Sequence, residues 1–339
     1  MIGSQPSRPP FPVTLDNWQS ADQLGWTFQH MAEIFTTAAI SRSIESAVRL
    51  PTRSEPVHEI VLVGPDGVSR TVGEVIAATN TDGWMVLDRG TVIAEHYLGE
   101  LQPSTPHLLM SVSKSIVGIV VGELVGRGLI DVEAPLTRYV PELGASGYAG
   151  ATVRNVLDMR SGIKFSENYL DPYAEVRLLD QAFGWAPRLV PDVPETLRGF
   201  LRSLTQAAPH GGAFNYRSCE TDILGWVCEA ATGRWFPELA SDLVWSRIGA
   251  EFDANIGLDA EGTGMFDGGI SATLGDLARF GMMILGEGTS LTGAQVVAPE
   301  WIADTFAGAP DSRQAFADSP GDNRMPGGMY RNQFWFPYA

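Results

Sequence analysis

The sequence predicts an α+β fold in which a sheet domain is assembled from both ends of the chain, with a helical domain inserted between them. Strand signals occur in the first part, the middle is mostly helical, and strand signals return towards the end. No period of about 20 to 50 residues recurs, which argues against a repeat architecture. We therefore expect residues 1–130 and 266–339 to form the sheet domain and residues 131–265 to form the helical domain.

Composition excludes several classes of protein. The 339 residues include 23 basic and 40 acidic side chains, for a net charge of −17. This charge opposes binding to nucleic acid or to an anionic membrane, because both require a positive protein surface. No apolar run reaches membrane-spanning length, and the start of the chain shows no secretory signal. We expect a cytoplasmic protein with no nucleic-acid or membrane partner.

The first elements follow from periodicity. "SADQLGWTFQHMAEIF" has apolar residues at helical spacing after a capping serine, Ser20, which predicts a helix over residues 20–35. "WMVLDRGTVIAEHYLG" predicts a β-hairpin with strands at 84–87 and 91–97. The apolar run "SVSKSIVGIVVGELVGRGLI" predicts a helix that begins at serine, is buried on most sides and ends at the glycines.

Later segments continue the pattern. Helices are expected in the middle of the chain at "VRNVLDM", "PETLRGFLRSL", "TDILGWVCEAATG" and "FPELASDLVWSRIG". "GGISATLGDLARFGMMIL" predicts an amphipathic helix capped by Thr273, and a further helix is expected to begin at Pro299. The final stretch, "MYRNQFWFPYA", predicts one strand that stops abruptly.

Lys114, one of only two lysines in the chain, lies beside serines at the head of the long apolar run. Ser111 is three residues earlier, so on a helix the two side chains share a face. Burial and the positive end of the helix dipole predict a lowered lysine pKa and an amine able to take the serine proton. Arginine could not do this, because it does not deprotonate in proteins. The alternative is that the spacing arises by chance and Ser111 is only an N-cap.

A serine–lysine pair needs a second group to protonate the leaving amine or alcohol. Tyr216 in "FNYRSCETD" is a candidate, with Ser218 two residues later, in a loop just before a helix. The alternative is a tyrosine that only packs in the core or an interface. Cys219 and Cys228 match no common zinc spacing and are expected to be reduced and structural. We expect no metal and no cofactor.

Four motifs occur together in the order and spacing of a known family: "LLMSVSKSIVG", "VRNVLDMRSGI", "FNYRSCETDILGWV" and "GGISATLGDLARFGMMIL". The chain resembles the serine β-lactamase-like hydrolases, which include class C β-lactamases, penicillin-binding proteins and related esterases. "LDNW", "HLLMSVSKS", "SENYLDP" and "YVPEL" are similar to the branch that degrades nylon oligomers. The resemblance covers the chain from about residue 15 onward. It implies an antiparallel sheet flanked by helices, with an inserted helical domain.

The resemblance also assigns catalytic roles. Ser111 resembles the family's acylated nucleophile, and Lys114 resembles its base. Tyr216 resembles the acid or base of the second motif, usually Y-x-N, which is Y-x-S here with Ser218. The resemblance thus implies a reaction that proceeds through an acyl-enzyme.

Three further residues are substrate-binding candidates through the same resemblance. Tyr169 in "SENYLDP" resembles a residue of a loop that closes over bound amide. Asp180 lies where a carboxylate can meet a substrate ammonium, although a solvated acidic residue is the alternative. Asp267 falls where relatives often have a polar amide and is expected to line the site.

The family's third motif, K-T-G or H-x-G on a strand that walls the site, does not follow "RNQFWFPYA". We therefore expect C-terminal strands to be missing and activity to be impaired. The leading hypothesis is a serine hydrolase of small ω-amino amides. The alternatives are a short-chain carboxylesterase of the same fold and an impaired homologue that only binds ligand. The expected partners are a small-molecule substrate and, from the resemblance alone, a second copy of the chain.

Overall fold

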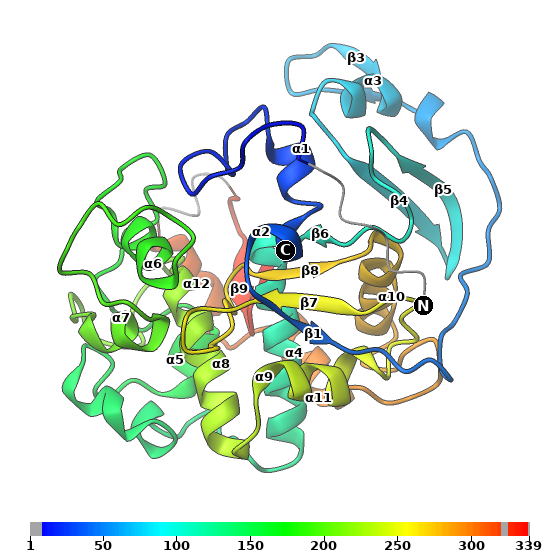
Figure 1. The fold of residues 1–339 in the computed structure, drawn as a ribbon. Helices are drawn as coiled ribbons and strands as arrows, with labels where there is room; N and C mark the ends of the chain where they lie inside the picture. Colours follow the sequence, from blue (N-terminus) through cyan, green and yellow to red (C-terminus); the bar gives the residue numbers. More distant parts are fainter. Residues whose placement is uncertain (1–8, 320–324, 338–339) are drawn as a thin grey trace.

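A computed structural model describes residues 9–319 and 325–337 of the protein (Figure 1). At its centre lies an antiparallel sheet in the order β1-β7-β8-β6. Its strands come from distant parts of the chain: β1 Thr37–Ile40, β6 His107–Leu108, β7 Ala254–Gly257 and β8 Ile270–Ala272. Pairing of these segments brings the region before the long apolar run beside the region after the helical middle.

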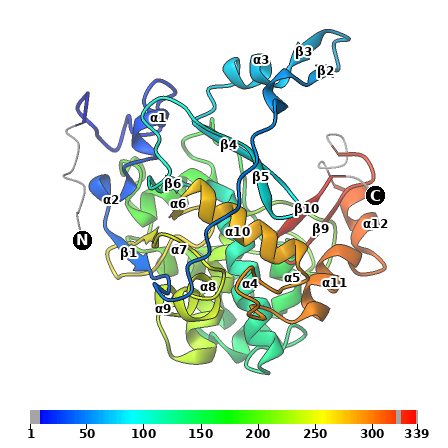
Figure 2. The ribbon, with the colours of Figure 1, turned by 90° about the vertical axis from the view of Figure 1, so that its right-hand side faces the viewer.

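Three two-stranded hairpins complete the strands of the described residues. They are β2 Val61–Val63 with β3 Ser69–Thr71, β4 Gly83–Asp88 with β5 Thr91–Tyr97, and β9 Met329–Arg331 with β10 Phe334–Phe336. The predicted hairpin at 84–97 is confirmed as β4 and β5. Figure 2 shows β2, β3 and the short helix α3 (Val72–Ala77) standing away from the rest of the molecule.

The helices α5 to α9 gather on one side of the sheet (Figure 1). The helices of the described residues, besides α3, are α1 Leu24–Thr27, α2 Met31–Ile34, α4 Ser113–Gly126, α5 Val153–Leu157, α6 Glu175–Phe183, α7 Leu197–Ser203, α8 Ser218–Thr232, α9 Phe236–Ala240, α10 Leu274–Leu285, α11 Pro299–Ala307 and α12 Ser312–Ala317. Shorter 3-10 turns and one π-turn, Ser241–Trp245, lie between them. None of the helices in the described ranges is long and apolar enough to cross a membrane.

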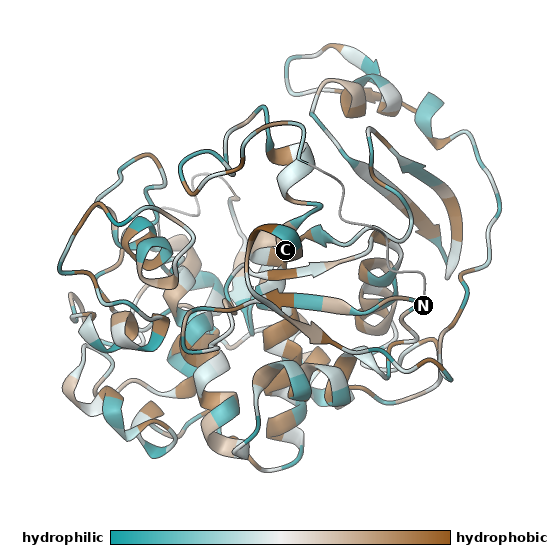
Figure 3. Ribbon diagram, in the orientation of Figure 1, coloured by the Kyte–Doolittle hydropathy of each residue, from teal (hydrophilic) through white to brown (hydrophobic). Residues whose placement is uncertain are grey.

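Helix α4 is the centre of the hydrophobic core, as its composition predicted. Ile116, Ile119 and Val120 are fully buried, and Figure 3 shows apolar residues along this helix and the strands beside it. Two glycines let other elements approach α4 closely. A Cβ on Gly118 would lie 2.5 Å from the backbone oxygen of Asn332, and one on Gly122 would lie 2.4 Å from the Trp301 indole nitrogen.

Other helical predictions are also confirmed in detail. Thr273 caps α10 by accepting a hydrogen bond from the backbone N–H of Asp276, because a threonine oxygen can satisfy a free N–H of the first turn. Helix α11 begins at Pro299. Both cysteines are buried, and neither forms a disulfide within the described residues.

Two predictions at the ends of the chain are wrong. The helix expected over residues 20–35 is two short helices, α1 and α2, separated at His30, and Ser20 caps neither. The single strand expected at the end is the hairpin β9–β10, because Asn332 and Gln333 both adopt positive φ and reverse the chain. The last two residues of that segment, 338 and 339, lie outside the described residues.

Candidate active site

Ser111 lies where the chain leaves the sheet and enters the core helix. After β6, the backbone N–H of Leu109 still bonds the oxygen of Ile270 in β8, at 2.8 Å. Met110 then takes a positive φ of 46°, an uncommon conformation for a residue other than glycine. Ser111 follows in a 3-10 turn and is exposed to solvent. It therefore precedes α4, which begins at Ser113, rather than lying inside that helix as predicted.

Lys114 is the centre of the polar cluster. Its side chain is 1% exposed, and its Nζ donates to Ser111 Oγ at 3.2 Å, to Ser218 Oγ at 3.3 Å and to the backbone oxygen of Asp267 at 2.6 Å. An ammonium has three N–H donors, so these three oxygens accept all of them. A neutral amine in the same position would turn its lone pair to one of the two hydroxyls and accept its proton.

The predicted direction of the Lys114 pKa is wrong. Burial lowers the pKa, but the surrounding acidic groups outweigh burial and raise the pKa above its ordinary value. Asp267 contributes most to this rise, followed by Tyr216, Glu167 and Asp222. Asp267 Oδ2 lies 3.6 Å from Lys114 Nζ. Burial and the helix dipole can be expected from the local sequence, but the carboxylates of remote segments lie around the amine only in the folded chain.

Tyr216 and Ser218 reach the cluster from the start of α8. Lys114 Nζ lies 5.3 Å from the centre of the Tyr216 ring, within the range of a cation–π contact. The ring stacks on Trp335 of β10, with centroids 5.2 Å apart, so the terminal hairpin fixes its plane. The structure thus places Tyr216 and Ser218 beside Lys114.

Glu167 is a site residue that sequence reasoning did not single out. Its carboxylate accepts hydrogen bonds from the Tyr169 hydroxyl, at 2.5 Å, and from the backbone N–H of Ser218. Burial raises the pKa of Glu167. Tyr169 remains 52% exposed, so the loop reaches from the cluster to solvent. The sequence offers only an acidic residue two places before Tyr169, which by itself carries no signal.

Asp180 lies on α6 and does not contact Ser111 or Lys114 directly. Its Oδ2 accepts from Arg177 at 2.7 Å. Burial raises the pKa of Asp180 to about 7, with Arg177 opposing the rise and the charges of Asp267 and Glu167 adding to it. Asp180 therefore shares the electrostatic environment of the cluster, although Arg177 is its partner.

Asp222 holds the loop that carries Asp267. Its Oδ1 accepts from the backbone N–H groups of Phe266 and Asp267, each at 3.1 Å. Burial, together with the neighbouring charge of Asp267, raises the pKa of Asp222 well above its ordinary range. Asp222 lies one turn into α8, and only the fold shows that it reaches this loop.

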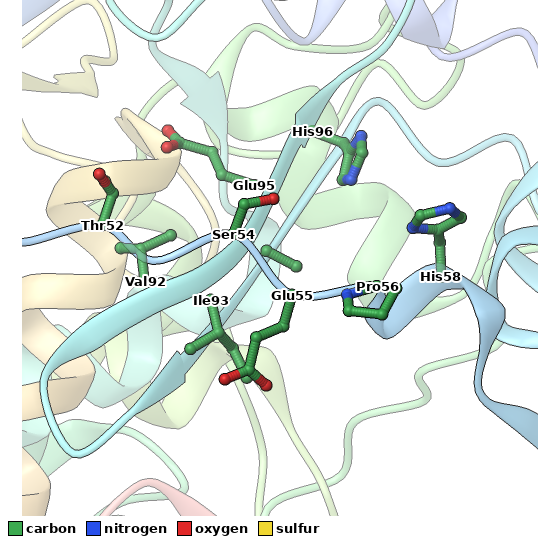
Figure 4. Close-up of a pocket in the computed structure, with 10 residues that line it drawn as sticks. Thr52, Ser54, Glu55, Pro56, His58, Val92, Ile93, Glu95 and His96 are labelled. Atoms are coloured by element: carbon green, nitrogen blue, oxygen red, sulfur yellow. The ribbon is translucent and has the colours of Figure 1, made fainter.

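A separate cavity of about 490 Å³ lies between the segment 52–58 and strand β5 (Figure 4). It is lined by Thr52, Ser54, Glu55, Pro56, His58, Val92, Ile93, Ala94, Glu95 and His96. Glu55 accepts from Arg53, and Glu95 accepts from Tyr97, so both carboxylates already have local partners. Within the described ranges no group of three or more acidic, histidine or cysteine side chains is arranged to hold a metal.

Comparisons with known proteins show which family the chain is similar to. A model of the Beta-lactamase family matches residues 68–336. The chain is 38% identical over 340 residues to a 6-aminohexanoate-dimer hydrolase of Paenarthrobacter ureafaciens, covering 98% of this chain and 83% of the relative. An esterase/beta-lactamase of Mycobacterium tuberculosis is 34% identical over 167 residues, covering 49% of this chain and 35% of the relative. A solved structure of a candidate 6-aminohexanoate-dimer hydrolase from Bacillus anthracis superposes with a TM-score of 0.89 at 26% identity, covering 99% of this chain and 85% of that one.

Proposed function

The chain belongs to the Beta-lactamase family and is a hydrolase of amides or esters, and we propose that it cleaves small ω-amino amides through an acyl-enzyme on Ser111. The observation that carries the proposal is the Lys114 amine, which touches Ser111 Oγ and Ser218 Oγ beside the Tyr216 ring. Lysine can serve a serine nucleophile in this way because its neutral form is a base within hydrogen-bond reach.

Acylation would begin with Lys114 as a neutral amine. Ser111 Oγ attacks the substrate carbonyl carbon, and its proton passes to Lys114 Nζ. As the tetrahedral intermediate collapses, the C–N bond breaks and the leaving nitrogen takes a proton. Tyr216 is the donor in this proposal, and Lys114 returns a proton to the phenolate. A water molecule then attacks the acyl carbon, the same groups act in reverse, and Ser111 is released with its proton.

Acidic residues around the nucleophile support a substrate with a positive end. Glu167, Asp180 and Asp267 surround the cluster, and a substrate ammonium placed among them would be stabilised by opposite charge. The relative from Paenarthrobacter ureafaciens is named for 6-aminohexanoate dimer, which has an ammonium end and one amide. We therefore propose this linear dimer as the test substrate.

A short-chain carboxylesterase is the second candidate. The relative from Mycobacterium tuberculosis is named as an esterase/beta-lactamase. A serine–lysine pair that attacks an amide can also attack an ester, whose carbonyl carbon is the more reactive of the two. Comparing turnover of 6-aminohexanoate dimer and of p-nitrophenyl butyrate in one preparation separates the two. Higher kcat/KM on the dimer favours the amidase, and measurable turnover of the ester alone favours the esterase.

The nucleophile is tested by peptide mapping after exposure to a fluorophosphonate, which phosphonylates activated serines with loss of fluoride. We expect one adduct on Ser111 and none in Ser111→Ala. Ser115→Ala is the matched control, because Ser115 Oγ donates to the backbone oxygen of Gln333 and takes no part in the proposed chemistry. An adduct elsewhere, or none on the folded chain, contradicts the proposal. Dimer binding unchanged in Ser111→Ala, without turnover in either form, would instead support a ligand-binding homologue.

A further inference from the structure

Asp267 contacts Lys114 through two different groups. Its backbone oxygen accepts from Nζ at 2.6 Å, and its carboxylate Oδ2 lies 3.6 Å from the same nitrogen. The other carboxylate oxygen, Oδ1, is buried and has no hydrogen-bond partner. A buried carboxylate needs a compensating charge, because desolvation is costly for an unpaired ion. Lys114 supplies that charge, so the two side chains depend on each other.

The other titratable groups near Lys114 have different hydrogen-bond or ion-pair partners. Tyr216 faces Lys114 with its ring in a cation–π contact. The Glu167 carboxylate accepts hydrogen bonds from the Tyr169 hydroxyl and from the backbone N–H of Ser218. On α8, Asp222 is bonded to backbone N–H groups. On α6, Asp180 is paired with Arg177. Among the described residues, Asp267 is the carboxylate that forms an ion pair with Lys114.

We infer that Asp267 is a positioning residue that acts through Lys114: its carboxylate holds the ammonium in place, so that Lys114 takes the Ser111 proton only after it has first released one to solvent. The inference rests on the proposed role of Lys114 as base. The balance is simple. Lys114 loses one proton to water, the resulting amine accepts the Ser111 proton as the Oγ–carbon bond forms, and Asp267 itself transfers no proton.

The ion pair between Asp267 and Lys114 determines in which direction the pH dependence of acylation shifts. The base is the neutral amine, so the rate of acylation of Ser111 rises with pH as Lys114 deprotonates. The opposite charge of Asp267 favours the ammonium form and moves this rise in rate to higher pH. Asp267→Asn keeps the shape of the side chain and removes its charge. We expect the rise in that variant to move to lower pH by about one to three units.

The decisive measurement is NMR titration of the protein labelled with 13C at lysine Cε. The chain has only two lysines, so the spectrum should contain two lysine Cε signals. The signal that disappears in Lys164→Arg belongs to Lys164, and the other belongs to Lys114. Lys164 is an internal reference, because its side chain is 69% exposed. Asp180→Asn is the matched control: it is the same substitution on a nearby carboxyl, but that carboxyl is paired with Arg177 and holds neither Lys114 nor the Asp267 loop.

The titration midpoint of Lys114 should fall in Asp267→Asn and fall much less in Asp180→Asn, and the midpoint of Lys164 should stay the same in both variants. An unchanged or higher midpoint in Asp267→Asn overturns the inference, as does an equal fall in the two variants. Asp267→Ala gives the same reading if the asparagine variant does not fold. The titration needs no turnover, so it stands apart from a failure of the proposed function. The pH profile of fluorophosphonate labelling at Ser111 should move with the midpoint, and a profile that stays in place also overturns the inference.

Discussion

Gly225, in the interior of α8, lies against the loop that supplies the Asp267 oxygen to Lys114. A Cβ at Gly225 would lie 2.2 Å from two ring carbons of Phe266, against a normal carbon–carbon contact of about 3.5 Å. The ring has little room to yield, because it is fully buried, packs on Phe236 with centroids 4.8 Å apart, and its backbone N–H is bonded to Asp222. Gly225→Ala should therefore destabilise the packing of α8 against Phe266 and displace the loop that contacts Lys114.

The expected change in the free energy of unfolding is the difference between two opposing effects. Overpacking a core costs about 1–3 kcal/mol, and the upper end applies where neighbours are fixed. Alanine regains about 1 kcal/mol over glycine in a helix interior. The expected net destabilisation is about 2 kcal/mol. Because Phe266 precedes Asp267, the labelling rate at Ser111 should fall as well.

Urea unfolding with a common m-value measures the change in stability. Gly281→Ala in α10 is the matched control, because nothing lies within 4 Å of its added Cβ. That variant should be more stable than the parent by up to about 1 kcal/mol. If Gly225→Ala is as stable as Gly281→Ala, the reasoning from close packing is refuted.

Two further predictions concern buried charge. Burial raises the pKa of Glu220 to about 8, opposed by Arg217, against about 4.3 in the unfolded chain. The folded state therefore binds the Glu220 proton more tightly than the unfolded state does. Between those two pH values, Glu220 should lower the free energy of unfolding by up to about 1.4 kcal/mol for each pH unit by which the pH rises. Urea unfolding at several pH values should show a flatter slope for Glu220→Gln. Arg331→Ala should cost about 3–5 kcal/mol, because it removes the 2.6 Å partner of buried Asp158. Arg234→Ala, at an exposed pair, should cost less than about 1 kcal/mol in the same assay, and equal losses would contradict the role given to burial.

Local patterns predicted much of the fold. The hairpin β4–β5, the buried helix α4 and the Thr273 cap of α10 depend on residues close together in sequence, so their signals are complete within one window. The helix expected over 20–35 failed because apolar spacing does not reveal the break at His30. The terminal hairpin was missed because its turn uses Asn332 and Gln333 at positive φ, without a glycine to indicate it.

The sequence by itself determined that Ser111, Lys114 and Tyr216 are the residues to examine, because lysine is rare in this chain and the motifs occur in a recognisable order. Only the tertiary structure decided the charge state around them. Glu167, Asp222 and Asp267 lie 53, 108 and 153 residues after Lys114 in the sequence. Their electrostatic fields raise a lysine pKa that burial alone would lower. Electrostatic interaction depends on distance in space, which the spacing of residues along the chain does not give.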